Sequence, residues 1–315
     1  MTLKTIQNLT TIITILLATA FLTLIERKIL ASTQIRKGPN IVGIYGLSQP
    51  IADAIKLIIK ETINYKINHF FIITPIITIS IAFTAWTLIP LDNKSPQSSP
   101  NIGMMLIFAL SSLSVYSILL SGWASNSKYA LLGSIRATAQ MISYEVAIGI
   151  IILTAIYLSS SLNLSTISIT QQFIWYIIPL FPAFTMFLIS SIAETNRTPF
   201  DLTESESELV SGFNTEYSSI LFTLLFLAEY INILLMASIL SILFLSNDTL
   251  LTQKTPLISS TKIIIITYIF IWIRSTYPRM RYDQLMNLLW KSYLPLSLTL
   301  TIILPSIILL TTIHP

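Results

Sequence analysis

Long runs of apolar residues make up most of the chain, and short polar segments separate them. A helix needs about 20 apolar residues to cross roughly 30 Å of hydrocarbon. The runs do not alternate as barrel strands do, and a backbone in lipid must bond to itself, so each run is predicted to be a helix. We predict about eight transmembrane helices, over residues 9–25, 70–91, 102–120, 140–158, 173–193, 218–245, 257–274 and 285–313.

Composition supports this fold class. Of the 315 residues, 53% are apolar and 10% are charged, whereas a soluble domain carries about 25% charged residues. The first run follows Lys4 and ends in Glu26-Arg27-Lys28 without a small-residue cleavage site, so we expect a retained span. The sequence therefore predicts an all-α, polytopic membrane protein that forms a single integral membrane domain over residues 1–315.

The basic residues are unevenly divided between the two sides of the membrane. With eight spans, thirteen of the eighteen lysines and arginines fall on one side and four on the other. The basic side is expected to face the cytoplasm or the matrix. An even number of spans places both termini on the opposite side.

An amphipathic helix is predicted over residues 47–62, between the first two spans. Ser48 is suited to the N-cap and Pro50 to the first turn. Polar residues share one face and isoleucines the other. Such a helix lies flat at the membrane interface or packs under a partner.

The most polar stretch covers residues 194–217 and lies on the basic side. It holds six of the fourteen carboxylates of the chain: Glu194, Asp201, Glu204, Glu206, Glu208 and Glu216. We predict that Thr198-Pro199 breaks the preceding helix, that a capping box from Thr203 to Glu206 begins a short helix, and that Gly212 ends it. Asp201, Glu204 and Glu208 then share a face, and Glu206 points elsewhere. This acidic loop is either a solvated helix or a polar path between Glu194 and the span that contains Glu229.

Two further carboxylates, Glu145 and Glu229, fall inside predicted spans. A charge at this depth costs roughly 2.5–3.5 kcal/mol on insertion scales and usually faces a polar interior or an ion path. Tyr144 and Tyr230 lie next to them and are candidates to extend a hydrogen-bond chain. The residues indicate either proton transfer or a structural pair with a buried basic residue.

The sequence also limits the chemistry that the chain can perform by itself. It has no cysteine, and its two histidines, His69 and His314, lie far apart. Thiolate metal sites, iron–sulfur clusters and disulfides are thereby excluded. We find no phosphate-binding loop, nucleophile motif or metal cluster, and expect no nucleic-acid partner. The inner basic residues either set the topology and contact lipid phosphate, or line a polar mouth beside an apolar tunnel.

Several of the polar segments resemble chain 1 of mitochondrial NADH:ubiquinone oxidoreductase, respiratory complex I. The most specific is Glu194-Thr-Asn-Arg-Thr-Pro-Phe-Asp-Leu. The match runs from the first span to the last and is carried by residues 26–30, 34–43, 121–127, 142–146, 193–214 and 272–284.

The resemblance implies an eight-helix subunit of the mitochondrial inner membrane, at the heel of the membrane arm. The acidic loop would face the matrix and both termini the intermembrane space. Ubiquinone would be the substrate, with no cofactor bound by this chain alone, while iron–sulfur clusters, FMN and NADH would belong to partner subunits. Those partners would be the quinone-site subunits of the hydrophilic arm and the proton-pumping subunits of the membrane arm. Phospholipid, including cardiolipin, would also bind.

The resemblance also implies roles for particular residues. A quinone tunnel would be formed by Glu26, Arg27, Arg36, Asp53, Phe226 and Arg274. A proton-coupling path would be formed by Tyr144, Glu145, Glu194, Asp201, Glu204, Glu206, Glu229 and Tyr230, with Arg136 and Arg197 as charge partners. Ser205 stands where the family has glycine, which would stiffen the loop slightly. Two alternatives to this function remain open: a stand-alone proton or cation transporter, and a passive membrane anchor.

Overall fold

The computed structural model describes residues 2–61, 69–90, 100–202, 212–246 and 256–313, and every regular element in these ranges is helical. The long helices are α1 (Thr2–Thr33), α3 (His69–Thr87), α4 (Gly103–Ala124), α5 (Lys128–Ser159), α9 (Ser219–Phe244), α10 (Pro256–Thr276) and α12 (Leu294–Ile313). The shorter elements are η1 (Ile44–Gly46), α2 (Gln49–Ile59), α6 (Leu164–Thr170), α7 (Phe181–Glu194), η2 (Gly212–Glu216), α11 (Tyr282–Leu288) and the π-helical turn η3 (Leu289–Tyr293).

Seven helices among the described residues are long and apolar enough to cross a membrane, and α7 is a shorter apolar helix. The helix that runs from Tyr282 to Leu310 combines α11, η3 and most of α12. These eight segments correspond to the eight predicted spans and confirm a polytopic all-α protein.

The predicted fifth span was wrong at its start. Residues 173–180 form turns, and α7 begins only at Phe181, with Pro182 in its first turn. Proline suits that position because its missing N–H would have no helical partner. At 14 residues, α7 is about 21 Å long, shorter than the hydrocarbon core. The preceding connection contains the short helix α6.

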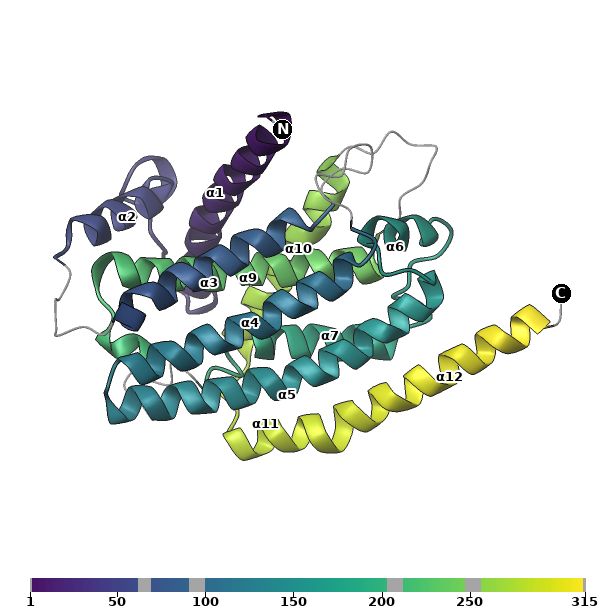
Figure 1. Ribbon diagram of the computed structural model, residues 1–315. Helices are drawn as coiled ribbons and strands as arrows, with labels where there is room; N and C mark the ends of the chain where they lie inside the picture. Colours follow the sequence, from purple (N-terminus) through teal and green to yellow (C-terminus); the bar gives the residue numbers. More distant parts are fainter. Residues whose placement is uncertain (1, 62–68, 91–99, 203–211, 247–255, 314–315) are drawn as a thin grey trace.

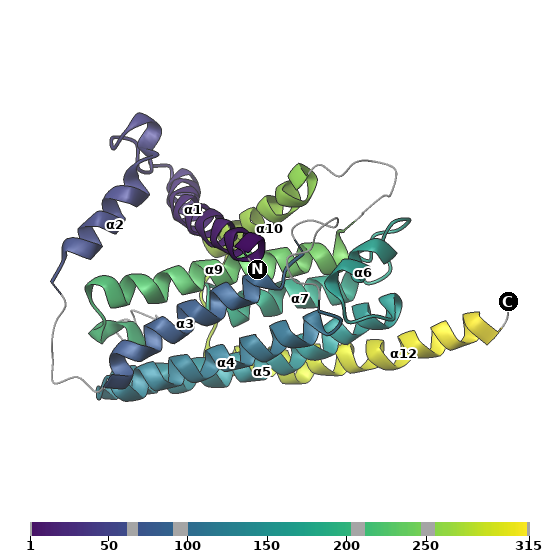
Figure 2. The ribbon, with the colours of Figure 1, turned by 45° about the horizontal axis from the view of Figure 1, so that its top comes forward.

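The helices form a bundle in which some neighbours are consecutive in sequence and others are far apart. Helices α3, α4 and α5 lie side by side, α9 packs on α3, and α7 lies against α5 and α9 (Figures 1 and 2). Helices α1 and α10 pack on α9, whereas α12 runs along α5 and its C-terminal part leaves the bundle. This arrangement brings the N-terminal span next to the helix that carries Glu229 and Tyr230.

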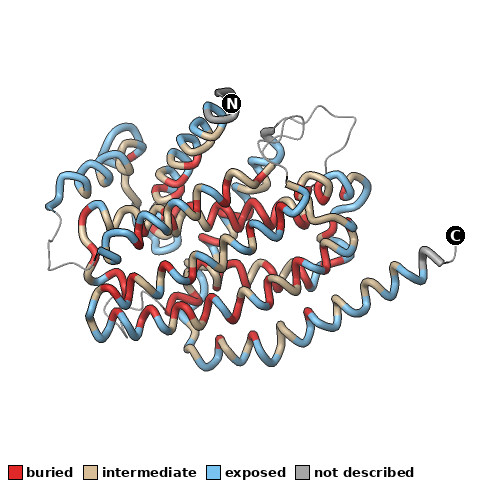
Figure 3. Tube along the Cα trace, viewed as in Figure 1, coloured by how far each residue is buried: buried red, intermediate tan, exposed pale blue. Residues whose placement is uncertain are grey.

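The core is centred on α5, α7 and α9, as the red segments in Figure 3 show. Tyr144, Phe187 and Phe244 are its largest fully buried side chains. Large apolar residues are exposed along α1 and α12, for example Ile13, Ile302 and Leu310. Exposed apolar surface on this scale is unusual for a soluble monomer and agrees with a membrane setting.

Many serines and threonines inside the spans bond to their own helix. The hydroxyls of Thr19, Ser190 and Ser238 each donate to the carbonyl three residues earlier, at 2.7–3.0 Å. Such bonds satisfy a hydroxyl without a tertiary partner. A hydroxyl in a span therefore marks a functional site only when it also contacts another element.

The amphipathic helix α2 is present but shorter than predicted. It ends at Ile59, since Lys60 is already extended. Ser48 precedes the helix, yet its hydroxyl donates to the Val42 carbonyl at 2.9 Å and makes no cap bond. No residue of α2 is buried.

Candidate functional site

The most extensive buried ionic cluster among the described residues surrounds Glu26, near the C-terminal end of α1. Its carboxylate accepts a bond from Arg197 at 3.2 Å and from the Tyr230 hydroxyl at 2.6 Å. Arg274, at the end of α10, pairs with the same carboxylate. The Arg197 guanidinium also lies over the Tyr230 ring, 4.3 Å from its centroid, a favourable cation–π contact.

A cavity with about 20 Å³ of space for water centres adjoins this cluster. Glu26, Arg197 and Arg274 line one part of it, and the rest is largely apolar. The cavity is narrow, but it brings two guanidinium groups and a carboxylate next to side chains such as Leu22 and Phe270. The lining thus combines a few polar groups with a largely apolar wall, a combination typical of small-molecule sites.

The other predicted tunnel residues have contacts outside this cluster. Arg27 and Asp53 form an ion pair at 2.6 Å that joins α1 to α2, and both are partly exposed. Arg36 is exposed and its Nε donates to the Gln34 side chain at 2.8 Å. Phe226 packs on Phe222, with the ring centroids 4.3 Å apart. The structure therefore brings Glu26 and Arg274 into one site, and places Arg27 with Asp53 in a neighbouring, more exposed pair.

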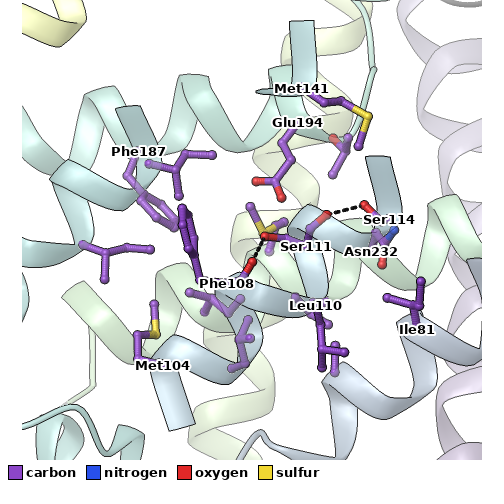
Figure 4. Close-up of a pocket in the computed structure, with 18 residues that line it drawn as sticks. Ile81, Met104, Phe108, Leu110, Ser111, Ser114, Met141, Phe187, Glu194 and Asn232 are labelled. Carbon is purple, nitrogen blue, oxygen red and sulfur yellow. Dashed lines mark hydrogen bonds between the residues drawn. The ribbon is translucent and has the colours of Figure 1, made fainter. Parts of the chain in front are cut away.

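A second, larger cavity contains Glu194 (Figure 4). It offers about 60 Å³ for water centres and lies between α3, α4, α5, α7 and α9. The Glu194 carboxylate points into it, and the rings of Phe108 and Phe187 close another side. Its polar lining comes from Glu194, Ser111, Ser114, Thr195 and Asn232.

Glu145 adjoins this cavity through a serine. It is half-buried on α5, and its carboxylate lies 3.2 Å from the hydroxyl of Ser111, which lines the cavity. Glu145 and Glu194 also interact electrostatically. Two of the predicted coupling carboxylates are thus brought to one site.

Thr195 lines both cavities, so the Glu26 cluster and the Glu194 cavity share a wall. Thr195 directly follows α7, and its hydroxyl bonds back to the carbonyls of Ser191 and Ile192. The link arises because Arg197 and Glu194 lie on one short turn of chain. The predicted tunnel and the predicted coupling residues are therefore contiguous at this point.

The two tyrosines do not bond to their neighbouring glutamates. Tyr144 is fully buried and donates to the Leu285 carbonyl at 3.2 Å, while Tyr230 donates to Glu26. Adjacent residues on a helix point in different directions, so sequence proximity was a poor guide to these partners. Glu229 on α9 and Arg136 on α5 are both half-buried. Of the two predicted charge partners, Arg197 pairs with Glu26.

The N-terminal part of the acidic loop is held from two directions. The Gln140 amide, fully buried on α5, donates to the carbonyls of Ala193 and Phe200, both at 2.8 Å. Asp201 pairs with Arg279 at 3.2 Å, and the Met280 N–H donates to the Pro199 carbonyl at 2.9 Å. Glu204, Glu206 and Glu208, with the predicted capping box, lie outside the described residues.

The C-terminal part of the loop packs at a glycine contact. Gly212 has a φ of +56° and lies close to Gly133 of α5. A Cβ added to Gly133 would come 2.9 Å from the Cα of Gly212. Phe71 and Tyr217 stack with centroids 4.1 Å apart, and the Tyr217 hydroxyl lies 3.0 Å from that of Thr74. Burial raises the pKa of Tyr217 to about 12, although the Thr74 bond opposes this. Tyr217 is therefore a neutral anchor of the loop at physiological pH.

Replacing Gln140 with leucine is expected to destabilise this region. The change keeps the volume but removes two buried hydrogen bonds, each with a net value of about 1 kcal/mol. We expect a loss of roughly 1–3 kcal/mol, seen as a lower midpoint temperature for thermal inactivation of the assembled protein. Gln284→Leu, at an exposed glutamine of α11, is the control. An unchanged midpoint for Gln140→Leu would show that the amide does not hold the loop.

Sequence reasoning missed Gln140, Thr195, Ser111 and Asn232 as parts of this site. Serines and threonines are common in these spans, so composition alone could not single out Ser111 or Thr195. Gln140 offered a weak signal, since a glutamine in an apolar span must find partners for its amide. Among the described residues, no three histidine, aspartate or glutamate side chains are grouped to hold a metal ion.

The fold and the site together define a polytopic helical membrane protein with buried ionic groups and intramembrane carboxylates. The sequence profile described as NADH dehydrogenase matches residues 6–305. Similar proteins include NADH-ubiquinone oxidoreductase chain 1 of Priodontes maximus, 55% identical over 92% of each chain. Those of Oncorhynchus mykiss and Chondrus crispus are 52% and 50% identical, over 94% and 96% of this chain and 93% and 96% of theirs. The chain belongs to the NADH-ubiquinone oxidoreductase chain 1 family, and is a membrane subunit of respiratory complex I.

Proposed function

We propose that this subunit forms part of the ubiquinone access tunnel and couples quinone reduction to proton pumping through its intramembrane carboxylates. The observation that carries the proposal is the shared wall at Thr195. It makes the Glu26 cluster, which suits a quinone head group, contiguous with the cavity of Glu194. A change of charge in one cavity then acts at short range on ionisable groups in the other, where the low dielectric strengthens the effect.

The chemistry of the Glu26 cluster supports a role in the tunnel. Arg197 and Arg274 are fixed donors, and a quinone carbonyl is an acceptor. Glu26 balances part of their charge while the tunnel is empty. A quinone that gains electrons becomes a stronger acceptor and competes with Glu26 for these guanidinium groups. The partner exchange would leave Glu26 with the Tyr230 hydroxyl, which donates to it at 2.6 Å.

The coupling path would continue from Glu194 to Glu145, with Glu229 and the acidic loop as further members. Asp201 is held by Arg279, so the loop would respond to charge changes at the junction of α10 and α11. Glu204 and Glu206 are proposed members on the strength of the family resemblance. Arg136 is proposed as a charge partner on the same basis.

The proposed setting follows from the family. The protein would lie in the mitochondrial inner membrane, with the acidic loop on the matrix side and both termini on the intermembrane-space side. Iron–sulfur clusters, FMN and the NADH site would belong to hydrophilic-arm subunits. The proton-pumping subunits would adjoin this chain within the membrane, and phospholipid, including cardiolipin, would cover the exposed apolar faces.

The proposal is tested by Glu145→Gln and Glu194→Gln in the assembled complex. Glutamine keeps the shape but cannot release or carry the carboxyl proton. A positioned proton-transfer group contributes about 10²-fold or more to a reaction rate. Because water can replace part of this contribution, we expect quinone reduction and pumping to fall together by roughly tenfold. Both are measured in sealed vesicles, as quinone-dependent NADH oxidation and as protons moved per electron.

Asp283→Asn provides the control, because its side chain is 75% exposed and belongs to an exposed pair with Arg281. Full turnover and pumping in both glutamine variants would overturn the coupling role. Loss of assembly with normal turnover of the remaining complex would indicate a passive anchor instead. Proton transport by the purified chain alone would indicate a transporter.

A further inference from the structure

The hydroxyl of Ser111 has two possible acceptors but only one proton. Its oxygen lies 2.8 Å from the carbonyl oxygen of Phe108 and 3.2 Å from a carboxylate oxygen of Glu145. A serine hydroxyl donates one hydrogen bond and accepts two. The Ser111 proton can therefore go to only one of these two acceptors at a time. The hydroxyl of Ser114, one turn further along the helix, donates to the Ser111 carbonyl at 2.6 Å.

The choice follows the protonation state of Glu145. When Glu145 is ionised, its oxygen is the stronger acceptor, so the Ser111 proton turns toward it. When Glu145 is protonated, its own O–H can donate to Ser111, whose proton then turns to the Phe108 carbonyl or into the cavity. In each state the carboxyl and the hydroxyl are both satisfied, and no helix has to move.

Ser111 also connects Glu145 to the Glu194 cavity, because it contacts the one and lines the other. Ser111 lines that cavity, together with Ser114 and Asn232 (Figure 4). The space of about 60 Å³ has room for roughly four water molecules, and the polar groups give hydrogen-bond partners to the waters beside them, which can bond to one another. A proton that leaves Ser111 thus has a polar route toward Glu194.

We propose that Ser111 is a relay residue that passes a proton between Glu145 and the cavity of Glu194. The inference rests on the proposed coupling function and adds a group to its path. In the forward step, the O–H bond of Glu145 breaks and a new O–H bond forms on Ser111. The original Ser111 proton moves to a water in the cavity, and that water gives a proton to the Glu194 carboxylate. Ser111 ends with one proton, and one proton has moved from Glu145 to Glu194.

The test compares three variants of the assembled complex. Ser111→Ala removes the relay, Ser111→Thr keeps a hydroxyl and adds a methyl group beside the cavity, and Ser117→Ala is the matched control. Ser117 is a buried serine of the same helix that donates to the Ser114 carbonyl and has no carboxylate among its bonds. The measurements are quinone-dependent turnover, protons moved per electron, and the infrared carbonyl band assigned to Glu145 by its loss in Glu145→Gln.

We expect Ser111→Ala to lower turnover and pumping by roughly three- to tenfold, because water can replace part of a relay hydroxyl. Ser111→Thr should recover most of the activity, and Ser117→Ala should retain all of it. The Glu145 band should shift to higher wavenumber in Ser111→Ala, since its carboxyl loses a hydrogen bond. A serine that bonds only to its own helix, as Ser117 does, would not move this band.

Two outcomes separate the relay from the function on which it rests. Normal turnover and pumping in Ser111→Ala, with Glu145→Gln impaired, would overturn the relay and leave the proposed function intact. Normal behaviour of Glu145→Gln itself would overturn the proposed function. If Ser111→Ala assembles poorly, the Glu145 infrared band is measured on the fraction that does assemble. An unshifted band in that fraction would overturn the relay.

Discussion

Replacing Glu26 with alanine is expected to abolish most assembled, quinone-reducing complex. The carboxylate is shared by Arg197, Arg274 and Tyr230, and its side chain is only 6% exposed. The side chains of Arg197 and Arg274 are 15% and 32% exposed, so water can replace the lost partner only in part. Removing one member of a buried ion pair costs about 3–5 kcal/mol, which corresponds to a roughly 10²- to 10⁴-fold change in an equilibrium constant.

The effect is measured as complex content on native gels and as quinone-dependent NADH oxidation per milligram of membrane protein. Glu26→Gln keeps an oxygen acceptor without the charge and should be intermediate. Asp283→Ala removes an acid from an exposed pair and should behave as wild type, because such pairs contribute little. Normal assembly and turnover of Glu26→Ala would contradict a structural and functional role for the cluster.

Replacing Gly122 with alanine is expected to disrupt the contact between α4 and α5. A Cβ on Gly122 would overlap with both Oγ and Cβ of Ser134. The Oγ could rotate away, but the Cβ of Ser134 is attached to the backbone of α5 and cannot. Both residues are buried. Overpacking typically costs 1–3 kcal/mol, and with no rotamer to relieve it we expect about 3 kcal/mol and a fall of roughly 5 °C in the inactivation midpoint.

The opposing change supplies the rescue. Ser134→Gly in the Gly122→Ala background removes the overlapping atoms and should restore most of the lost stability, whereas Ser134→Ala keeps the overlapping Cβ and should not. Gly103→Ala is the control in the same helix, since a Cβ there would make only an ordinary 3.7 Å contact with Pro100. A Gly122→Ala protein of unchanged midpoint would mean that α4 and α5 do not approach this closely.

The sequence predicted the membrane spans well, but it predicted only some of the residues that form the site. The apolar runs located the spans but not every helix start: α5 begins at Lys128, before the predicted residue 140, and in α7 prolines and turns replaced the expected first two turns. Glu145 was singled out because a carboxylate in an apolar run is costly and therefore informative, and Glu194 because it begins the acidic stretch. Ser111 and Thr195 were missed, since their hydroxyls resemble the many that bond only to their own helix.

By itself, the sequence determined that the chain is a bundle of membrane helices with carboxylates inside it. That outcome is local: each apolar run must satisfy its own backbone in lipid, whatever its neighbours do. Only the tertiary structure decided which charges meet. Glu26 and Tyr230, 204 residues apart, share a hydrogen bond because α1 packs on α9 and the two helices are rotated about their axes so that these side chains face each other. Helix neighbours and rotations depend on the packing of the whole bundle, and residue spacing within one helix cannot specify them.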